Sequence, residues 1–212
     1  MTTAATLKPK REPSLIIACG ALAKEIQHLK VLNGWEQFRV QCLDAELHNH
    51  PEQIPEKLQA AIDKYRDQYD HIYIGYADCG TGGQIDRIIE KEGLERLPGA
   101  HCYAFFQGVE AFDALAAEEL GTFYLTDFLA RHFERLIIRG FKLDKHPELV
   151  DMMFGNYKRL VYLSQTDETA LMEAAQKAAQ YLGLEFRHIH TGYGELESSL
   201  NVQSIKWHPR HA

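Results

Sequence analysis

Three of the four cysteines in this 212-residue chain stand at the edges of predicted strands, beside glycine or proline. Cys19 and Cys79 are each followed directly by a glycine, and Cys102 comes shortly after a proline–glycine pair. Free cysteine usually packs as a small hydrophobic side chain, but a purely structural thiol has no reason to favour loop edges next to glycine. We therefore interpret these three thiols as candidates for chemistry. Cys42, inside an apolar run, is expected to be a packed core thiol.

Thiolate sulfur is a preferred ligand of zinc and of iron–sulfur clusters. Separations of 60 and 23 residues along the chain exclude a zinc ribbon, whose ligands come in close pairs, but not a site assembled from several strand ends. His48 follows the second predicted strand much as Cys19 follows the first, and His50 competes with it for the fourth position. The sequence thus predicts a zinc site made by Cys19, His48, Cys79 and Cys102. An iron–sulfur cluster on the three cysteines is the alternative.

Two ionisable residues directly precede these thiols. Asp78 comes before Cys79, and His101 comes before Cys102. Carboxylate and imidazole groups transfer protons at neutral pH, so we take both as candidate catalytic residues. His101 could instead hydrogen-bond to a metal ligand.

Glycines dominate the turn that follows Cys79, namely Gly80, Gly82 and Gly83. A glycine-rich turn between a strand and a helix can offer backbone N–H groups to an anion. The dipole of the helix that follows this turn would also favour the thiolate form of Cys79. The pattern is neither G-x-G-x-x-G nor a P-loop, so it predicts a cofactor or anion contact rather than a nucleotide site.

Strands and helices must alternate along the chain to position these residues. Continuous apolar runs are typical of strands covered on both faces, and segments with helical period lie between them. We expect one α/β domain with a mainly parallel sheet and helices on both faces, a Rossmann-like three-layer arrangement whose ligands bind beyond the carboxyl ends of the strands. The domain should span residues 14–200, with tails at 1–13 and 201–212. The apolar runs are 15–18, 38–43, 72–76, 101–105, 122–125, 160–163 and 186–189.

Composition narrows the class of partner. A net charge of −7 argues against nucleic-acid binding, which needs clustered positive charge. No apolar run approaches the ~18 residues of a membrane span, and neither a secretory signal nor a disulfide framework is evident. We expect a cytoplasmic protein with reduced thiols that acts on a small molecule or binds another protein. The oligomeric state is not predicted.

Four segments, in their order along the chain, resemble one bacterial and archaeal family. They are Ile16–Leu22, Tyr76–Gly83, His101–Tyr103 and Gly121–Thr126, and the family is catalogued as domain of unknown function 1638. The resemblance covers roughly residues 15–196. It implies a link to one-carbon metabolism, because genes of this family often lie beside those for corrinoid-dependent methyltransferases and their reductive activators.

The family pattern falls on the same four residues that we predict as metal ligands. In many relatives an acidic residue separates the histidine and cysteine of the third motif, whereas His101 and Cys102 are adjacent here. The resemblance implies an enzyme or accessory factor that uses a thiolate-bound zinc ion in methyl-group or corrinoid chemistry. Three alternatives remain: an iron–sulfur protein, a non-enzymatic partner or metal-delivery protein of a corrinoid system, and a nucleotide- or cofactor-binding α/β domain whose cysteines are incidental.

Overall fold

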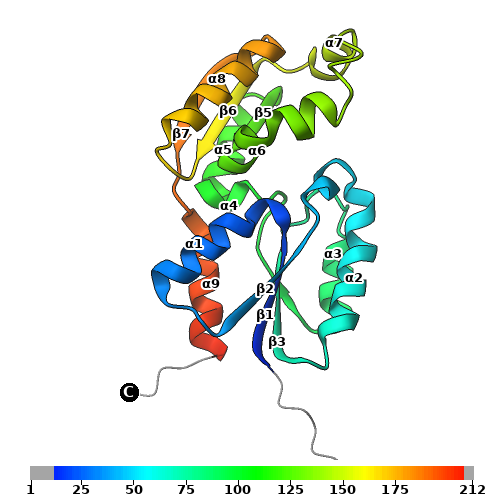
Figure 1. Ribbon diagram of the computed structural model, residues 1–212, viewed down its shortest axis with the longest axis vertical. Coiled ribbons are helices and arrows are strands. Elements are labelled where there is room, and N and C mark those ends of the chain that lie inside the picture. The colour runs from blue at the N-terminus through cyan, green and yellow to red at the C-terminus, as the bar shows by residue number, and fades with distance from the viewer. Residues whose placement is uncertain (1–11, 208–212) are drawn as a thin grey trace, which may run out of the picture.

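Two parallel β-sheets form the framework of the computed structural model, which describes residues 12–207 (Figure 1). The strands are β1 (Glu12–Cys19), β2 (Phe38–Leu43), β3 (Tyr69–Gly75), β4 (Glu95–Arg96), β5 (Thr122–Thr126), β6 (Arg159–Ser164) and β7 (Glu185–His190). The helices are α1 (Ala23–Asn33), α2 (Ile54–Tyr65), α3 (Gln84–Glu92), α4 (Ala104–Gln107), α5 (Val109–Glu118), α6 (Asp127–Phe133), α7 (Leu149–Phe154), α8 (Thr169–Leu182) and α9 (Gly194–Trp207). A π-helical segment, Glu134–Arg139, continues α6, and short 3-10 turns occupy Gly20–Leu22, Ala45–Asn49 and Pro51–Gln53.

The first sheet has the strand order β2-β1-β3-β4. Its central strand β1 is apolar without alternation, and every residue from Leu15 to Ala18 is buried, because helices cover both faces of the sheet. Helices α1 and α9 lie on one face, and α2 and α3 lie on the other (Figure 1). We call this sheet with its four helices the first lobe.

The second sheet has the order β5-β6-β7 and is also covered on both faces. Leu160 and Tyr162 of β6 pack in the cluster formed with α6 and α8, whereas Val161 and Leu163 pack with α5 on the opposite face. We call this sheet with α5 to α8 the second lobe. Helix α4 contacts α9 of the first lobe and α5 of the second. The predicted α/β class, with parallel strands between helices, is confirmed.

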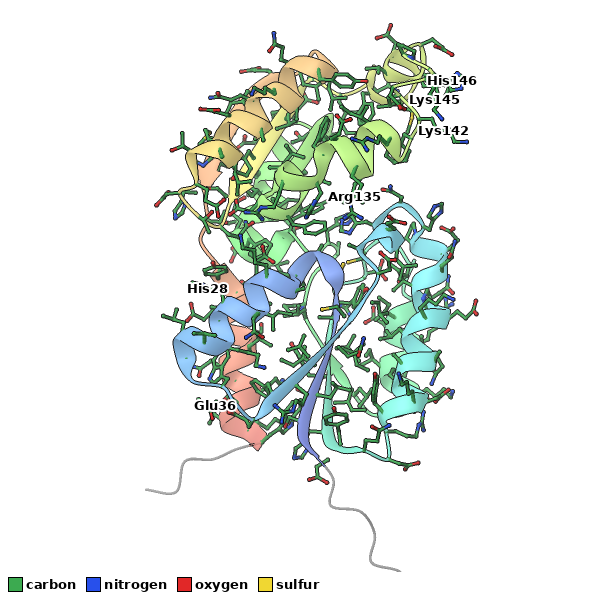
Figure 2. The ribbon with its side chains drawn as sticks, viewed as in Figure 1. His28, Glu36, Arg135, Lys142, Lys145 and His146 are labelled. Atoms are coloured by element: carbon green, nitrogen blue, oxygen red, sulfur yellow. The ribbon has the colours of Figure 1, made fainter. Side chains whose placement is uncertain are left out.

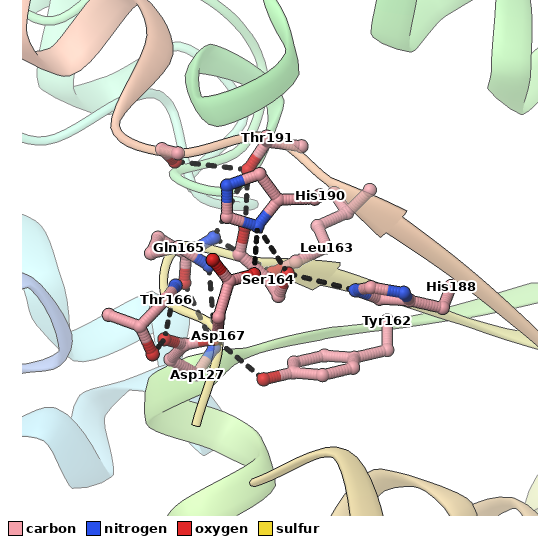
Figure 3. A network of polar contacts seen from close by, with 11 residues as sticks. Asp127, Tyr162, Leu163, Ser164, Gln165, Thr166, Asp167, His188, His190 and Thr191 are labelled. Atoms are coloured by element: carbon pink, nitrogen blue, oxygen red, sulfur yellow. Dashed lines mark hydrogen bonds and ion pairs between the residues drawn. The ribbon is translucent and has the colours of Figure 1, made fainter. Parts of the chain in front are cut away.

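A buried carboxylate at the start of α6 fastens the second lobe internally (Figure 3). Asp127 Oδ1 accepts hydrogen bonds from the Tyr162 hydroxyl at 2.7 Å and from the Gln165 N–H at 3.0 Å. Its Oδ2 accepts hydrogen bonds from the Thr166 N–H at 2.9 Å and from the Thr166 hydroxyl at 2.6 Å. These bonds tie the loop after β6 to the N-terminus of α6, which satisfies a charge that burial would otherwise disfavour.

The expectation of a single sheet is wrong in one respect, because the strands divide into two sheets. The apolar run 101–105, predicted as a strand, instead forms a turn and the beginning of α4. Ala104, Phe105 and Phe106 are all buried, and a short, fully buried helix cannot be distinguished from a buried strand by periodicity. Only the two-residue β4 stands at that edge of the first sheet, so the sheet does not continue into β5.

The predicted tails are too long at both ends. Strand β1 begins at Glu12, and the last helix α9 continues to Trp207. Leu196, Leu200 and Gln203 of α9 are buried at helical spacing, and the Trp207 ring stacks on His71 with a centroid distance of 5.0 Å. The remaining parts of the predicted tails, 1–11 and 208–212, lie outside the described residues. No helix within the described range is long and apolar enough to cross a membrane.

Candidate functional site

A cavity of about 370 Å³ lies where the first lobe meets the second. Cys19, His48, Cys79, His101 and Cys102 all contribute to its lining. Cys19 ends β1, and Cys79 follows its neighbour β3, so parallel pairing brings both to one edge of the sheet. The structure therefore gathers the four predicted metal ligands and one of the two predicted catalytic residues around a single space.

Cys79 and Cys102 are the closest pair in the cavity, with 2.8 Å between their sulfur atoms. The chain places them together through the Cys79 N–H, which donates to the Ala100 carbonyl at 2.8 Å. Cys79 adopts a left-handed backbone with φ of +50°, which is unusual for a residue other than glycine. The hydrogen bond from Cys102 lowers the pKa of Cys79, and the same contact together with burial raises the pKa of Cys102 well above its ordinary value. Cys79 is therefore the first of the two to become a thiolate.

Cys19 and His48 form a second pair, with 4.0 Å between Sγ and Nδ1. Cys19 is only 2% exposed, and burial raises the pKa of its thiol to about 12. His48 keeps accessible surface, yet the surrounding protein and the nearby His101 both lower its pKa. The isolated Cys19 thiol thus stays protonated at neutral pH unless a cation joins the site.

Tyr76 is buried beside these thiols, and its hydroxyl has no hydrogen-bond partner among the described residues. Burial raises the pKa of this phenol most and the neighbouring Cys19 raises it further, whereas the hydroxyl, as a hydrogen-bond donor to the thiolate form of Cys19, lowers the pKa of Cys19. A buried hydroxyl without a partner is costly. The arrangement leaves a donor ready for a thiolate at Cys19.

The structure does not bring the glycine-rich turn or Asp78 into the cavity lining. The Asp78 carboxylate accepts hydrogen bonds from the Thr81 hydroxyl at 2.8 Å, the Gly83 N–H at 2.8 Å and the Gly82 N–H at 3.2 Å. Burial opposes ionisation of Asp78, but these bonds outweigh it and lower the pKa. Two of the amide groups that we expected to bind an anion are therefore already occupied, and Asp78 shapes the turn instead of lining the cavity. The third glycine, Gly80, lies outside the cavity wall and packs near Pro51.

Two further predictions concern residues near the site. His50 is exposed and lies 3.4 Å from the Glu52 carboxylate, outside the cavity lining, so it does not compete with His48. Cys42 is half-buried and packs against the core of the first lobe. Cys42 does not line the cavity, which agrees with a packing role, and burial raises the pKa of its thiol.

Within residues 12–207, no group of three or more His, Cys, Asp and Glu side chains is close enough to hold a metal ion. The four predicted ligands instead form two separate pairs, at 2.8 Å and 4.0 Å. Zinc–sulfur bonds of ~2.3 Å would place two sulfur ligands about 3.8 Å apart in a tetrahedral site. A metal ion would therefore require Cys79 and Cys102 to separate by about 1 Å.

The opposite wall of the cavity comes from the second lobe, and sequence reasoning missed it. Strand β5, the π-helical segment, the loop after it and helix α7 supply mostly apolar side chains, among them Phe123, Leu136, Ile137 and Phe154. In the sequence these residues look like ordinary core positions. The structure adds one local sign, the π-helical segment, because such segments often occur at functional sites.

Polar contacts join the two lobes beside the cavity. The Asn49 side chain donates to the Leu136 carbonyl at 2.9 Å. Arg135, which points from the second lobe toward the first (Figure 2), pairs with Glu46 at 3.3 Å. A Cβ at Gly140 would lie 2.1 Å from the Leu136 oxygen, so only glycine leaves room for this arrangement.

A family model described as "Protein of unknown function (DUF1638)" matches residues 42–200, which is more than half of the chain. The matched segment contains His48, Cys79 and Cys102, whereas Cys19 precedes it. No curated protein and no solved structure matches the chain.

Proposed function

The chain belongs to the DUF1638 family, whose description names no activity, and from the geometry of its cavity we propose that it binds a zinc ion through Cys19, Cys79 and Cys102. The observation that carries the proposal is the meeting of three thiols and the His48 imidazole around one cavity. Thiolate and imidazole groups are the ligands that zinc prefers in proteins.

The chemistry of the donor set supports a cation at this position. Burial raises the pKa of Cys19, and the contact with Cys79 together with burial raises the pKa of Cys102, so both thiols stay protonated at neutral pH without a compensating positive charge. A bound divalent ion would provide that charge, and Cys19 and Cys102 would then hold it as thiolates. The Tyr76 hydroxyl then gains the acceptor that it lacks, because a Cys19 thiolate can accept its hydrogen bond.

His48 decides between a structural and a catalytic site. Its Nδ1 lies 4.0 Å from the Cys19 sulfur, close to the ~3.5 Å expected for two ligands of one zinc ion. If His48 remains bound, the site is closed and structural; if a substrate displaces it, the site has an open position. A bound zinc ion would supply Lewis acidity and could hold a substrate thiolate there.

At the level of the process, we propose a role in corrinoid-linked methyl-group metabolism, as an enzyme or as an accessory protein, in the reducing cytoplasm. The four free cysteines agree with such a compartment. A cavity of about 370 Å³ is at the lower end of the range for small-molecule sites. A corrinoid is much larger, so it would be carried by a partner protein.

Element analysis of the full chain, purified without added metal, tests the metal proposal. We expect about one zinc per chain in the wild-type protein, loss of zinc in Cys79→Ser and retention in Cys42→Ser, the matched control outside the cavity. His48→Ala should keep most of the zinc if the fourth position is replaceable. Iron together with acid-labile sulfide would establish the iron–sulfur alternative instead. Full zinc retention in Cys79→Ser, or no metal in any preparation, would refute the proposed site.

A further inference from the structure

We propose that the ligand of this cavity is an uncharged, largely apolar small molecule, alkyl or aryl in character, held with its functional end toward the thiols. This inference rests on the proposed function in one respect, since it takes the thiol end as the reacting end. The choice of ligand class comes from the opposite wall and from the charges that the cavity lacks.

The two ends of the cavity differ sharply in chemistry. The thiol end carries the sulfur and imidazole groups of the first lobe. The far end is formed by Leu136 and Ile137 of the π-helical segment and by aromatic rings of the second lobe, including Phe154 and Tyr157. Contact with such a wall favours apolar surface, because that surface is removed from water, and aromatic rings gain further from ring–ring packing.

Among the described residues that line the cavity, none is Asp, Glu, Lys or Arg. A carboxylate, phosphate or ammonium group on the ligand would lose its water without meeting an opposite charge, which is strongly unfavourable. The nearby Arg135 does not provide one, because it pairs with Glu46. The cavity therefore selects against charged ligands.

The surroundings of the far end also favour a small, enclosed ligand. The Asn49 side chain holds the Leu136 carbonyl at 2.9 Å, which fixes the π-helical segment against the first lobe. The rings of His101, Tyr103 and Tyr124 stack in succession, with centroid distances of 5.0 and 5.5 Å, and connect the thiol end to β5. Both walls are thus held in place, and the volume of about 370 Å³ limits the ligand to a compact molecule.

Three phenols that differ only at one end test this inference: 4-ethylphenol, which is uncharged, 4-hydroxyphenylacetate, which carries a carboxylate, and tyramine, which carries an ammonium group. Binding to the metal-free full chain is measured by isothermal titration calorimetry and by saturation-transfer NMR, because a zinc ion at the thiol end would itself attract a carboxylate. We expect 4-ethylphenol to bind about tenfold or more tightly than either charged analogue. Equal or tighter binding of a charged analogue, or no binding of any of the three, would overturn the inference.

Adjacent methionines in α7 provide a matched pair of variants. Met153 is half-buried and lines the cavity, whereas Met152 is 71% exposed and does not. Met153→Lys should weaken 4-ethylphenol binding and strengthen 4-hydroxyphenylacetate binding, each by about tenfold, because it supplies the missing cation. Met152→Lys should change neither. If Met153→Lys fails to fold, the comparison of the three phenols on wild-type protein still tests the proposed ligand class.

The two proposals fail separately. If the protein binds zinc but does not prefer 4-ethylphenol, only the proposed ligand class is wrong. If the protein prefers 4-ethylphenol but never binds metal, the proposed ligand class is supported and the proposed zinc site is wrong.

Discussion

Replacing Tyr76 with phenylalanine should stabilise the metal-free protein and weaken its binding of zinc. The Tyr76 hydroxyl is buried without a hydrogen-bond partner, so its removal eliminates a desolvation cost of about 1–3 kcal/mol in the metal-free state. The ring itself remains, which keeps the packing of a side chain that is 1% exposed. The free energy of unfolding should therefore rise.

Zinc binding should change in the opposite direction. A hydrogen bond from a phenol to a thiolate is charge-assisted and contributes about 1.5–3 kcal/mol. Its loss corresponds to zinc affinity that is about 10- to 150-fold weaker. Urea unfolding of chelator-treated protein measures the first effect, and competition with a coloured zinc chelator measures the second.

Tyr162→Phe serves as the control, because this buried hydroxyl does have a partner, the Asp127 carboxylate at 2.7 Å. That change should lower the free energy of unfolding by about 1.5–3 kcal/mol and leave zinc affinity unaltered. If Tyr76→Phe destabilises the metal-free protein as Tyr162→Phe does, the Tyr76 hydroxyl is satisfied and the reasoning is wrong. Unchanged zinc affinity in Tyr76→Phe would show that the Tyr76 hydroxyl does not donate a hydrogen bond to a Cys19 thiolate.

Three other substitutions have defined outcomes. Burial raises the pKa of Glu25 above its ordinary value of 4.5, so the folded state holds a proton that the unfolded state releases, and stability falls as pH rises above 4.5. Glu25→Gln should therefore stabilise the protein at pH 7 but not below pH 4.5, as urea unfolding at both pH values would show. Asn49→Ala removes the hydrogen bond to Leu136 and should speed amide hydrogen exchange in residues 134–139 without changing exchange in α8. Asp127→Ala leaves the four donors that bind this carboxylate without an acceptor. The free energy of unfolding, measured with urea, should fall by about 3–5 kcal/mol. A loss of metal binding with unchanged stability would contradict the structural role of Asp127.

The thiol end of the cavity could be predicted because it depends on a local rule. Residues that follow parallel strands meet at one edge of the sheet, and Cys19 and Cys79 follow neighbouring strands. Cys102 reaches the same place for a different reason. It belongs to a turn that is held to the Cys79 segment by a backbone hydrogen bond, and the apolar run around it is a helix rather than a strand.

The apolar wall could not be predicted, because its residues have no distinguishing pattern in the sequence. Leu136 and Phe154 occupy positions that look like the core of any α/β protein, and only the packing of the second lobe against the first turns them toward the thiols. The glycine-rich turn shows the opposite failure. Its residues match an anion-binding pattern, but the pattern does not reveal that Asp78 already accepts the hydrogen bonds of Gly82 and Gly83.

The division into two sheets explains why the cavity has two chemically different ends. A continuous sheet would have placed a strand where Cys102 and α4 now lie, and the edge of the first sheet would then have been closed. Because the chain turns there instead, the edge that carries the thiols faces an apolar surface of a separate sheet. Phe128 of α6 packs against the core of the first lobe, and the polar contacts beside this junction join Asn49 with Leu136, Arg135 with Glu46 and, as an exposed pair at 3.5 Å, Lys24 with Glu168. Exposed ion pairs contribute little to stability, so a ligand that contacts both walls would itself add to the attachment between the lobes.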